Sequence, residues 1–459
     1  MKREILISML LFFVLSLHAQ MSQKLEAAMD SFNIDSQMKF ATAGFFVIDA
    51  SSGATVFNQN AFTGFAPAST EKVITAATAF DILGKDYSYS TKFGIATTSK
   101  GKSLYIQASG DPTLGSWRWD ETKEDSILKK LKLAIAVSGV KQFESIIIST
   151  TGWGTDDGLP SRWTWEDVGQ YYGAGSQALN WRENQFDLIV NSGANIGDPV
   201  SVVGTKPFLY DYKILSEATA AGKETGDLSA IYYPSKGESY HVLKGTIPVG
   251  KNNFAISGSI YDPNRQFAKS IINEIKNIAK VKSGTIEISQ ITNPNVEWIY
   301  THTSPPLSKI VYWFLRKSIN LYGEALIRTI ALEKKRKAET DIGVEMVQEH
   351  WKDKGVDVDE LHLFDGSGLS PQNRITPHAE VAVLNYARKQ NWFPEFYDGM
   401  PSYNDMKMKS GTINRVKGYT GYQKSRDGKE YVFSLLINNY NGSEYSLIRK
   451  MYKVLDLLK

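Results

Sequence analysis

The sequence predicts a mixed α/β (α+β) protein with more than one domain. Its 459 residues, 42% of them hydrophobic, exceed what a single hydrophobic core usually holds. Helix and strand patterns occur together near both ends of the chain, whereas residues 84–284 carry short strand-like runs separated by Gly, Asp and Pro turns. The ends are therefore expected to be mixed α/β, and the middle is expected to be mostly β.

The first twenty residues differ from the rest of the chain. Lys2 and Arg3 form a positive start, Ile5–Leu17 is an apolar run of 13 residues, and Ala19-Gln20 offers a small-residue cleavage point. A run of that length is too short to cross a bilayer, which needs about 20 apolar residues. Residues 1–20 are therefore predicted to be a removable signal peptide, and the mature protein is expected in the periplasm without an integral membrane segment. The alternative is a buried N-terminal helix.

The segment after this start combines helix and strand patterns. Residues 22–33 are expected to form a short helix. Alternation over 43–49 and a return over 54–57 predict a β-hairpin. The hairpin leads through Pro67-Ala68-Ser69 into an apolar helix over 73–83, and the alanines of this helix make it slim enough to lie deep in a domain.

The middle of the chain has a different sequence pattern. Strand-like runs occur at 104–108 and 145–149, and an aromatic cluster occupies 163–172. A polar stretch near 215–240 is expected to be a mobile loop.

Long helical patterns return from about residue 305. They cover 310–332, 340–354 and 377–390. Residues 431–438 are predicted to be a buried strand. The closing helix, 447–458, is expected to pack on that strand rather than on a membrane, because its lysines do not form one basic face.

Composition excludes several classes of function. The net charge of +3 and the absence of a Lys- or Arg-rich block argue against a nucleic-acid partner. There are no cysteines, hence no disulfides. Neither an H-E-x-x-H pair nor a G-x-S-x-G elbow occurs, which argues against a zinc peptidase and an α/β-hydrolase. No metal or other cofactor is expected, and the base of a hydrolase would not be histidine.

Ser69-Thr70-Glu71-Lys72 is the first segment with catalytic chemistry, because a lysine one helical turn after a serine can activate it. The pattern S-x-x-K by itself is weak, since it occurs five times, starting at Ser36, Ser69, Ser99, Ser126 and Ser138. Only Ser69 follows a hairpin and opens an apolar helix. The alternative is that Ser69 is simply an N-cap.

Ser318-Ile319-Asn320 is the second segment, placed inside the helical pattern of residues 312–332. Its hydroxyl and amide could bridge a lysine and a substrate amide. S-x-N also occurs at residues 31–33 and 402–404, and a solvated helix face is the alternative.

Lys409-Ser410-Gly411-Thr412 is the third segment. A lysine, a hydroxyl and a glycine on an edge strand would let a substrate backbone pair closely while its carboxylate finds a cation. The same letters occur at residues 282–285. Only the later copy produces the order S-x-x-K, S-x-N, K-[ST]-G that penicillin-binding proteins and serine β-lactamases share.

With these motifs the chain resembles the DacB-type (class C) low-molecular-mass penicillin-binding proteins, the D-Ala-D-Ala carboxypeptidase/endopeptidase family. Residues 67–70 open the first motif as they do in that family, residues 110–114 and 365–370 match two of its turns, and residues 432–439 match the strand after the third motif. The long stretch between the first and second motifs matches the family's large insertion. Ser410 stands where Thr is commoner and keeps the hydroxyl.

The resemblance implies a penicillin-binding-protein/β-lactamase-like transpeptidase domain made of residues 21–83 and 285–459. Residues 84–284 would form the large inserted, mostly β, second domain, with a third domain nested in it. The implied partners are peptidoglycan stem peptides and β-lactams.

The resemblance also implies a division of roles. Ser69 would attack the penultimate D-Ala carbonyl while Lys72 takes its proton, and a penicillin would acylate the same serine. Ser318 would relay the proton and Asn320 would bind the substrate amide. The third motif would bind the substrate's carbonyl and its terminal carboxylate, through Lys409, Ser410, Gly411 and Thr412. In the family an acidic residue of the insertion contacts the amino group of the substrate's third residue, and Asp167 matches its position; a surface carboxylate is the alternative.

Two other functions stay open. A serine β-lactamase shares the motif order, but Ser176 stands where a Glu would be expected to activate the deacylating water, and the large insertion favours the peptidase. A non-catalytic peptidoglycan-binding protein on the same fold would not need all three motifs with their reactive groups.

Overall fold

The computed structural model describes residues 20–153, 158–233, 240–290, 295–334 and 337–459. Two compact units make up the chain. The first contains Met1–Lys85, Val311–Ser318 and Val344–Lys459, and the second contains Asp86–Ile310 and Ile319–Gly343.

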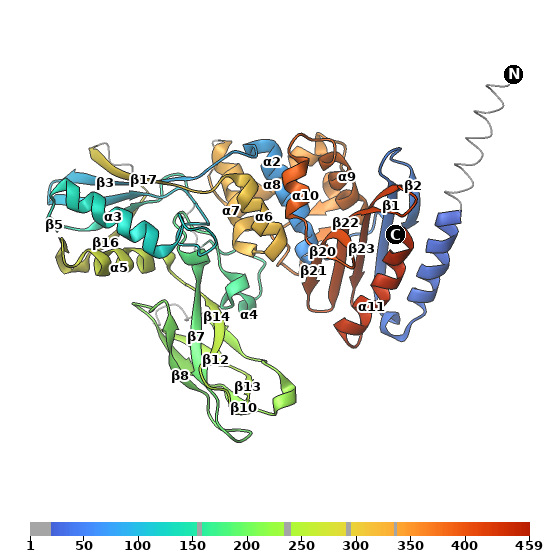
Figure 1. The fold of residues 1–459 in the computed structure, drawn as a ribbon, viewed down its shortest axis with the longest axis horizontal. Helices are drawn as coiled ribbons and strands as arrows, with labels where there is room; N and C mark the ends of the chain where they lie inside the picture. Colours follow the sequence, from blue (N-terminus) through green and yellow to red (C-terminus); the bar gives the residue numbers. More distant parts are fainter. Residues whose placement is uncertain (1–19, 154–157, 234–239, 291–294, 335–336) are drawn as a thin grey trace. The chain divides into compact units, whose positions relative to one another are not determined.

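A six-stranded antiparallel sheet is the framework of the first unit, in the order β2-β1-β23-β22-β21-β20 (Figure 1). The pair β1–β23 joins segments far apart in sequence, because Thr42 faces Asn438 and Asp49 faces Tyr431. Both ends of the chain therefore share one sheet. The strands are β1 (Thr42–Asp49), β2 (Thr55–Gln59), β20 (Ser402–Tyr403), β21 (Met406–Ile413), β22 (Val416–Lys424) and β23 (Glu430–Asn438).

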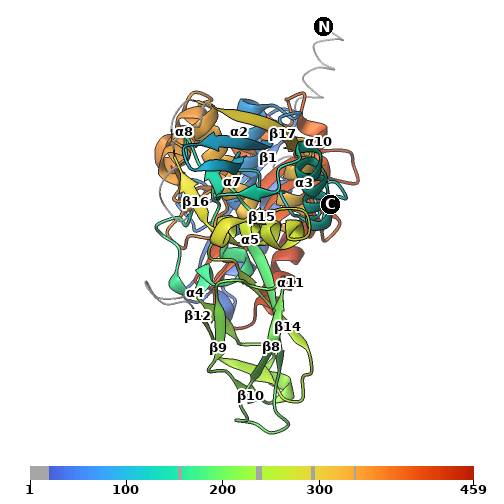
Figure 2. The same cartoon turned by 90° about the vertical axis from the view of Figure 1, so that its left-hand side faces the viewer.

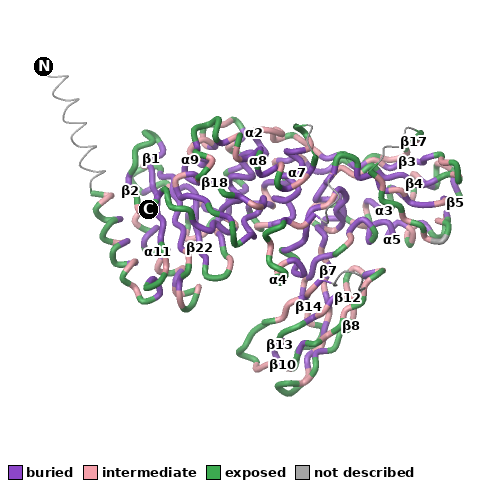
Figure 3. The backbone as a smooth tube through the Cα atoms, turned by 180° about the vertical axis from the view of Figure 1, so that it is seen from behind, coloured by how far each residue is buried: buried purple, intermediate pink, exposed green. Residues whose placement is uncertain are grey.

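Helices cover both faces of this sheet. On one face, Leu25 and Phe32 of a helix over residues 20–33 and Leu447 and Met451 of α11 (Glu444–Leu455) join one hydrophobic core with the strands. On the other face α9 (Pro377–Ala387) packs on β1 and β23, and α2 (Lys72–Leu83) packs on α9. The strands between these layers are largely buried (Figure 3).

The chain also contains further helices and short strands outside this sheet. They are η1 (Ser36–Met38), η2 (Ala68–Glu71), α6 (Leu307–Lys317), α7 (Asn320–Glu333), α8 (Thr340–Lys352), η7 (Val358–Glu360), β18 (Leu361–His362), β19 (Arg374–Ile375), α10 (Phe393–Gly399) and η8 (Asp456–Leu458).

The second unit contains a five-stranded sheet in the order β16-β6-β4-β3-β17, with a core that it shares with two helices. In one of them, α3, the side chains of Ile127, Leu131 and Ile135 recur at helical spacing and are buried, and Gly139 ends the helix at a φ of 71°. The elements are β3 (Ser90–Thr98), β4 (Gly101–Gln107), α3 (Glu124–Ser138), β5 (Gln142–Phe143), β6 (Ile146–Ser149), α5 (Pro263–Ile275), β15 (Lys280–Val281), η6 (Lys282–Gly284), β16 (Ile286–Ser289) and β17 (Val296–Thr303).

A second set of strands belongs to the same unit (Figure 2). It has its own hydrophobic core. Three small sheets build it, in the orders β14-β7-β8, β11-β12-β9 and β10-β13. The elements are α4 (Trp165–Val168), η3 (Tyr171–Gly173), η4 (Arg182–Asn184), β7 (Gln185–Asn191), β8 (Ser201–Lys206), β9 (Lys213–Ser216), β10 (Thr219–Ala221), η5 (Lys223–Thr225), β11 (Ala230–Tyr232), β12 (Tyr240–Lys244), β13 (Thr246–Pro248) and β14 (Phe254–Ser259).

Two predictions from the sequence were wrong in detail. The helix predicted over 310–332 is two helices, α6 and α7, because Ser318 between them has a left-handed φ of 57°. The loop predicted near 215–240 contains β10 and β11, which pair with β13 and β12; residues 234–239 lie outside the described part.

The insertion predicted from the sequence and the second compact unit of the structure have different boundaries. The insertion was predicted at 84–284, whereas the second unit begins at Asp86 and includes residues to Ile310 and from Ile319 to Gly343. Its strands, β3 to β17, are accompanied by the helices α3 and α5.

The predicted signal peptide falls almost entirely on residues 1–19, outside the described part of the chain. No helix within the described ranges is long and apolar enough to span a membrane.

Candidate active site

Ser69 lies in η2, directly before α2, in the first unit. Three residues later, Lys72 begins α2, and its ammonium donates to the Ser69 hydroxyl oxygen over 2.9 Å. The preceding residue, Ala68, has a φ of 49°, a left-handed conformation that is costly for a residue with a Cβ. Such strain is typical of positions where a turn must present a functional side chain.

The Lys72 ammonium is fully buried among groups of the first unit. Besides Ser69, it donates to the backbone carbonyl of Ser367 over 2.5 Å, and it lies 5.8 Å from the ring centre of Phe314 on α6. These contacts hold the amine in the direction of the serine hydroxyl.

The turn that supplies the Ser367 carbonyl is organised by Asp365. One carboxylate oxygen of Asp365 accepts the backbone N–H of Gly368 over 2.8 Å, and the other accepts that of Ser370 over 2.6 Å. Gly368 has a φ of 80°, and a Cβ there would lie 1.9 Å from the Ala68 carbonyl oxygen. No role was predicted for this turn, although its Asp-Gly-Ser-Gly composition is a signal for a tight, self-bonded loop.

The third motif lies on β21. Lys409 faces Thr420 of β22 and Thr412 faces Lys417, whereas β20 reaches only Met406 and Lys407 on the other side. Within the described chain, the edge of β21 from Met408 to Ile413 therefore has no partner strand. This agrees with the edge strand expected for the segment.

Gly411 brings this edge against the nucleophile turn. A Cβ at Gly411 would lie 2.4 Å from the Pro67 carbonyl oxygen and 3.1 Å from the Ser69 nitrogen. Only glycine allows the strand backbone to approach the turn this closely.

Lys409 is 1% exposed and donates to the carbonyl of Ser410 over 2.7 Å. Burial, together with the nearby Lys72 and Lys417 cations, holds the pKa of Lys409 well below its usual range. An incoming carboxylate would offset this repulsion, because an anion within a few ångströms favours the charged amine. By contrast, Lys282 of the earlier copy is an exposed lysine that pairs with Glu144 over 3.0 Å.

Ser318 and Asn320 flank the break between α6 and α7. Asn320 is the first residue of α7, and its side-chain amide donates to the carbonyl of Tyr172 over 2.7 Å, both in the second unit. Ser318 belongs to the first unit. The solvated helix face considered from the sequence does not describe these residues, since Asn320 is buried.

Asp167 also belongs to the second unit, on the short helix α4. Its carboxylate accepts the Thr164 hydroxyl over 2.6 Å and the Tyr172 hydroxyl over 3.2 Å. Since Tyr172 also receives the Asn320 amide, one tyrosine connects Asp167 to the second motif. Asp167 is half-buried.

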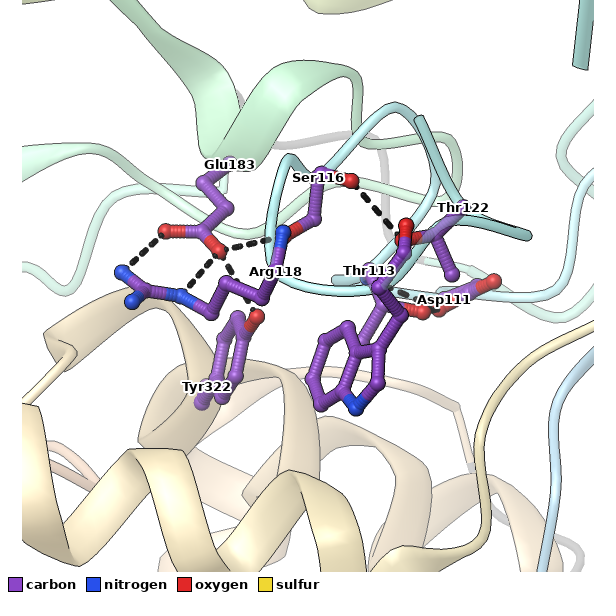
Figure 4. A network of polar contacts seen from close by, with 8 residues as sticks. Asp111, Thr113, Ser116, Arg118, Thr122, Glu183 and Tyr322 are labelled. Atoms are coloured by element: carbon purple, nitrogen blue, oxygen red, sulfur yellow. Dashed lines mark hydrogen bonds and ion pairs between the residues drawn. The ribbon is translucent and has the colours of Figure 1, made fainter. Parts of the chain in front are cut away.

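A buried network holds the first turn of α7 (Figure 4). Glu183, fully buried, accepts two bonds from Arg118, at 2.7 and 3.0 Å, and further bonds from the hydroxyls of Ser116 and Tyr322, at 2.7 and 2.8 Å. Tyr322 lies two residues after Asn320. The network therefore ties the segment that carries Asn320 to the loops of the second unit.

The other four S-x-x-K serines lie elsewhere. Ser126 and Ser138 donate to the backbone carbonyls of Asp120 and Ile135 at the two ends of α3. Ser36 begins η1, and Ser99 is exposed in the turn between β3 and β4. In none of these four cases does an apolar buried helix follow the serine.

Glu380 of α9 is a buried carboxyl in the core of the first unit. The Ser434 hydroxyl donates to it over 2.7 Å, and the hydroxyls of Thr70 and Thr420 lie beside it. Burial raises the pKa of Glu380 to about 7, against the opposing effect of these hydroxyls.

We expect Glu380 to make stability depend on pH. Between its ordinary pKa of 4.5 and about 7, the unfolded chain releases a proton that the folded protein keeps, so stability falls as pH rises through this window. Glu380→Gln removes the ionisation, and its stability relative to wild type should rise by up to about 3 kcal/mol between pH 5 and pH 8. Urea unfolding of both proteins at the two pH values measures this, and a difference that does not change with pH would contradict it.

No group of three or more His, Cys, Asp or Glu side chains in the described part of the chain is arranged to hold a metal ion.

The comparisons with known proteins agree on one family. Residues 25–456 match the D-Ala-D-Ala carboxypeptidase 3 (S13) family. The chain is 25% identical to a D-alanyl-D-alanine carboxypeptidase of Actinomadura sp. (strain R39), over 91% of this chain and 82% of that one. It is 24% identical to the penicillin-sensitive carboxypeptidase A of Dictyostelium discoideum, over 78% of this chain and 70% of that one.

A solved structure shows the same fold. The crystal structure of penicillin binding protein 4 (dacB) from Haemophilus influenzae matches with a TM-score of 0.78 and 19% identity, over 96% of this chain and 98% of that one. The family match spans almost the whole described chain, and the fold agrees with it. The chain therefore belongs to the D-Ala-D-Ala carboxypeptidase 3 (S13) family, and it is a serine-type carboxypeptidase.

Proposed function

We propose that the protein cleaves D-Ala-D-Ala bonds of peptidoglycan peptides through an acyl-enzyme on Ser69. The Ser69 oxygen attacks the penultimate D-Ala carbonyl while the Lys72 amine takes its proton. The carbon–nitrogen bond then breaks, the leaving amine receives a proton, and water hydrolyses the ester. The observation that carries the proposal is the 2.9 Å contact of a buried lysine with a serine at the start of a buried helix.

The free edge of β21 supports the proposal that the carboxylate end of the substrate binds there. The backbone N–H groups of Ser69 and Thr412 would stabilise the oxyanion, at roughly 3 kcal/mol for each donor. Lys409, with Ser410 and Thr412, would receive the terminal carboxylate. The repulsion among Lys409, Lys72 and Lys417 favours binding of an anion there.

The second motif would complete the transfer. Ser318 would relay the proton to the leaving amine, and Asn320 would hold the peptide amide of the substrate. The unusual φ of Ser318 supports a functional constraint at this position, because strained residues gather at active sites.

Penicillin should form the same ester, because it mimics the D-Ala-D-Ala end. Labelled penicillin followed by tryptic mapping tests the proposal, and the label is expected on the peptide that contains Ser69. A label on another serine, or none, would overturn it. A β-lactamase would release the hydrolysed drug rapidly, whereas this protein should retain the adduct.

Export to the periplasm is the second part of the proposal. Lys2 and Arg3 followed by the apolar run to Leu17 support a signal peptide. N-terminal sequencing of the protein from a periplasmic fraction should begin near residue 20, and a cytoplasmic protein that keeps Met1 would contradict export.

We further propose that Asp167 contacts a free amino group on the substrate's third residue. This contact is remote from the scissile bond, so Asp167→Asn should slow cleavage of peptides with a free side-chain amine severalfold, about 1 kcal/mol for a partly solvated ion pair. Penicillin acylation of Ser69 should stay unchanged. Steady-state kinetics on the peptide pair described next measures the effect.

The control for Asp167 is the same peptide with that amine acetylated, on which the variant and the wild type should converge. If Asp167→Asn discriminates between the two peptides as the wild type does, Asp167 is a surface carboxylate held by Thr164 and Tyr172.

A further inference from the structure

Lys417 is a buried lysine on β22, outside the three sequence motifs. It stands directly opposite Thr412 in the register of β21 and β22, so the two side chains lie on the same face of the sheet. Burial of a lysine is costly unless other groups compensate its charge, so its partners indicate what it does.

Two oxygen atoms contact the Lys417 ammonium. It donates to the Thr412 hydroxyl oxygen over 2.7 Å and to a carboxylate oxygen of Glu444 over 2.8 Å. The Thr412 hydroxyl in turn donates to the same Glu444 oxygen over 3.3 Å. The three groups therefore form a closed triangle, in which the hydroxyl accepts from the lysine and donates to the carboxylate.

The packing of α11 on the sheet fixes this triangle. Glu444 is the first residue of α11, and Leu447, one turn later, is part of the hydrophobic core that the helix shares with the strands. The Lys417 ammonium lies 5.4 Å from the centre of the Tyr419 ring, and the Tyr419 hydroxyl lies 3.2 Å from the hydroxyl of Tyr452 on α11. The positions of the lysine and the carboxylate are therefore both set by the contact of the helix with the sheet.

The members of the triangle differ in their access to water. The side chain of Lys417 is 7% exposed and that of Glu444 is 41% exposed, whereas Thr412 is an exposed residue on the edge of β21 that is unpaired within the described chain. The bond from Thr412 to Glu444 is also the longest of the three contacts. A ligand on this edge can therefore take the Thr412 hydroxyl from Glu444 while Lys417 stays in place.

The contact with Lys417 determines what the Thr412 hydroxyl can bind. Because an ammonium can only donate, the hydroxyl oxygen must accept from it, and the single hydroxyl proton is directed to another acceptor. A hydroxyl held in this way favours a carboxylate, with its charge and two acceptor oxygens, over an amide, in which an NH₂ donor replaces one oxygen. Hydrogen bonds in series also strengthen one another.

The inference rests on the proposed function, in which the substrate's terminal carboxylate meets Lys409, Ser410 and Thr412. Lys409 alternates with the two hydroxyl residues along β21, so a ligand on the edge of the strand can meet side chains from both faces. Burial and the Lys72 cation are the larger causes of the lowered pKa of Lys409, and the Lys417 cation is the third. The charge of Lys417 therefore acts at the place where the carboxylate would bind.

We propose that Lys417 and Glu444 together determine how tightly and how selectively the enzyme binds a free terminal carboxylate. Lys417 is a positioning residue that holds the Thr412 hydroxyl as a donor. Glu444 is an internal carboxylate that takes this donor until the substrate's carboxylate replaces it. Loss of Lys417 therefore weakens binding of the substrate's carboxylate, and loss of the Glu444 charge strengthens it.

The test compares two thioesters of the same N-acyl-D-Ala on the purified full-length protein. The leaving group is thioglycolate, which carries a carboxylate, in one of them, and thioglycolamide, which carries none, in the other. A thioester is reactive enough to be hydrolysed without the help of the carboxylate. The chain has no cysteine, so a thiol reagent reports only the released leaving group.

Lys417→Met keeps most of the length of the side chain and removes its charge. It should lower kcat/KM on the thioglycolate ester about tenfold, mainly through a higher KM, because the contact with the carboxylate is made in the ground state as well as in the transition state. On the thioglycolamide ester the variant should stay within about twofold of wild type.

Glu444→Gln should have the opposite effect. It preserves the shape of a partly exposed side chain and removes the competing charge, so KM for the thioglycolate ester should fall about threefold. Lys424→Met is the matched control, because Lys424 is an exposed lysine on the same strand that lies 4.0 Å from Glu430. This variant should behave as the wild type does on both thioesters.

A double-variant cycle shows whether Lys417 acts through Thr412. In a Thr412→Val background, Lys417→Met should lose most of its effect on the thioglycolate ester, because the donor that it holds is absent. The full tenfold loss in that background would overturn the positioning role.

Three further outcomes would overturn the inference. They are a wild type that does not discriminate between the two thioesters, a Lys417→Met variant that is impaired equally on both, and a Glu444→Gln variant with a higher KM for the thioglycolate ester. A wild type that penicillin does not acylate and that hydrolyses neither thioester would instead overturn the proposed function itself, so the two failures are distinguishable.

Discussion

Ser69→Ala is expected to abolish covalent labelling by penicillin and to lower kcat on D-Ala-D-Ala peptides by about 10⁶-fold, the loss that removal of the nucleophile causes in a serine peptidase. The reason is chemical: without the hydroxyl oxygen no ester forms, and Lys72 has no proton to take. Gel fluorescence with a labelled penicillin and steady-state kinetics measure both effects. The fold should survive, because alanine fits the space of a small, partly buried serine at this position.

Matched controls come from the chain itself. Ser36, Ser99, Ser126 and Ser138 each stand three residues before a lysine, and their alanine variants should label like the wild type. Lys72→Ala should also stop labelling, because it removes the base but leaves Ser69 in place. Labelling that persists in Ser69→Ala, or disappears in one of the four control variants, would contradict the assignment of the nucleophile.

The position of the Ser69 turn in the fold could be predicted from the sequence because several local signals coincide. A hairpin, a Pro-Ala turn and an alanine-rich helix follow one another, and the structure contains each as β1, β2, η2 and α2. The strand predicted over 431–438 is likewise present as β23 at the centre of the sheet. Long apolar runs with clear turns at both ends are the patterns from which secondary structure is most easily predicted.

The break at Ser318 could not be predicted in this way. Ile319 and Leu321 are both buried, so the apolar period continues through the break and resembles one helix. Helical periodicity reports which side chains face a core, and it does not report the φ of a single residue between two helices. The role of the Ser367 carbonyl could not be predicted either, because every residue has a backbone carbonyl and the sequence does not indicate which one accepts from Lys72.

The order of motifs along the chain distinguishes two copies of Lys-Ser-Gly-Thr that are identical in sequence. Local composition does not distinguish residues 282–285 from 409–412, and only the order of the motifs favours the second copy. In the structure Lys282 is exposed and paired with Glu144, whereas Lys409 is buried on the strand that approaches Ser69. The difference lies in tertiary contacts between segments more than 300 residues apart, which no local pattern contains.

Close approach of backbones at Gly411 should make Gly411→Ala the most damaging small substitution on β21. The added Cβ would lie 2.4 Å from the Pro67 carbonyl oxygen and 3.0 Å from the Thr70 nitrogen, so either the strand or the nucleophile turn must move. A displacement of about 1 Å between reacting groups costs about 100-fold in rate. The second-order rate of penicillin acylation should therefore fall by about 100-fold or more.

Gly204→Ala is the matched control for Gly411→Ala. Gly204 also lies within a strand, β8, but a Cβ there meets nothing within 4 Å. This variant should acylate at the wild-type rate. Circular dichroism and urea unfolding of Gly411→Ala show whether it stays folded, since overpacking costs about 1–3 kcal/mol. A folded Gly411→Ala that acylates as fast as Gly204→Ala would mean that β21 does not approach Ser69 as closely as these distances require, and the substrate would then have to be held by a different edge.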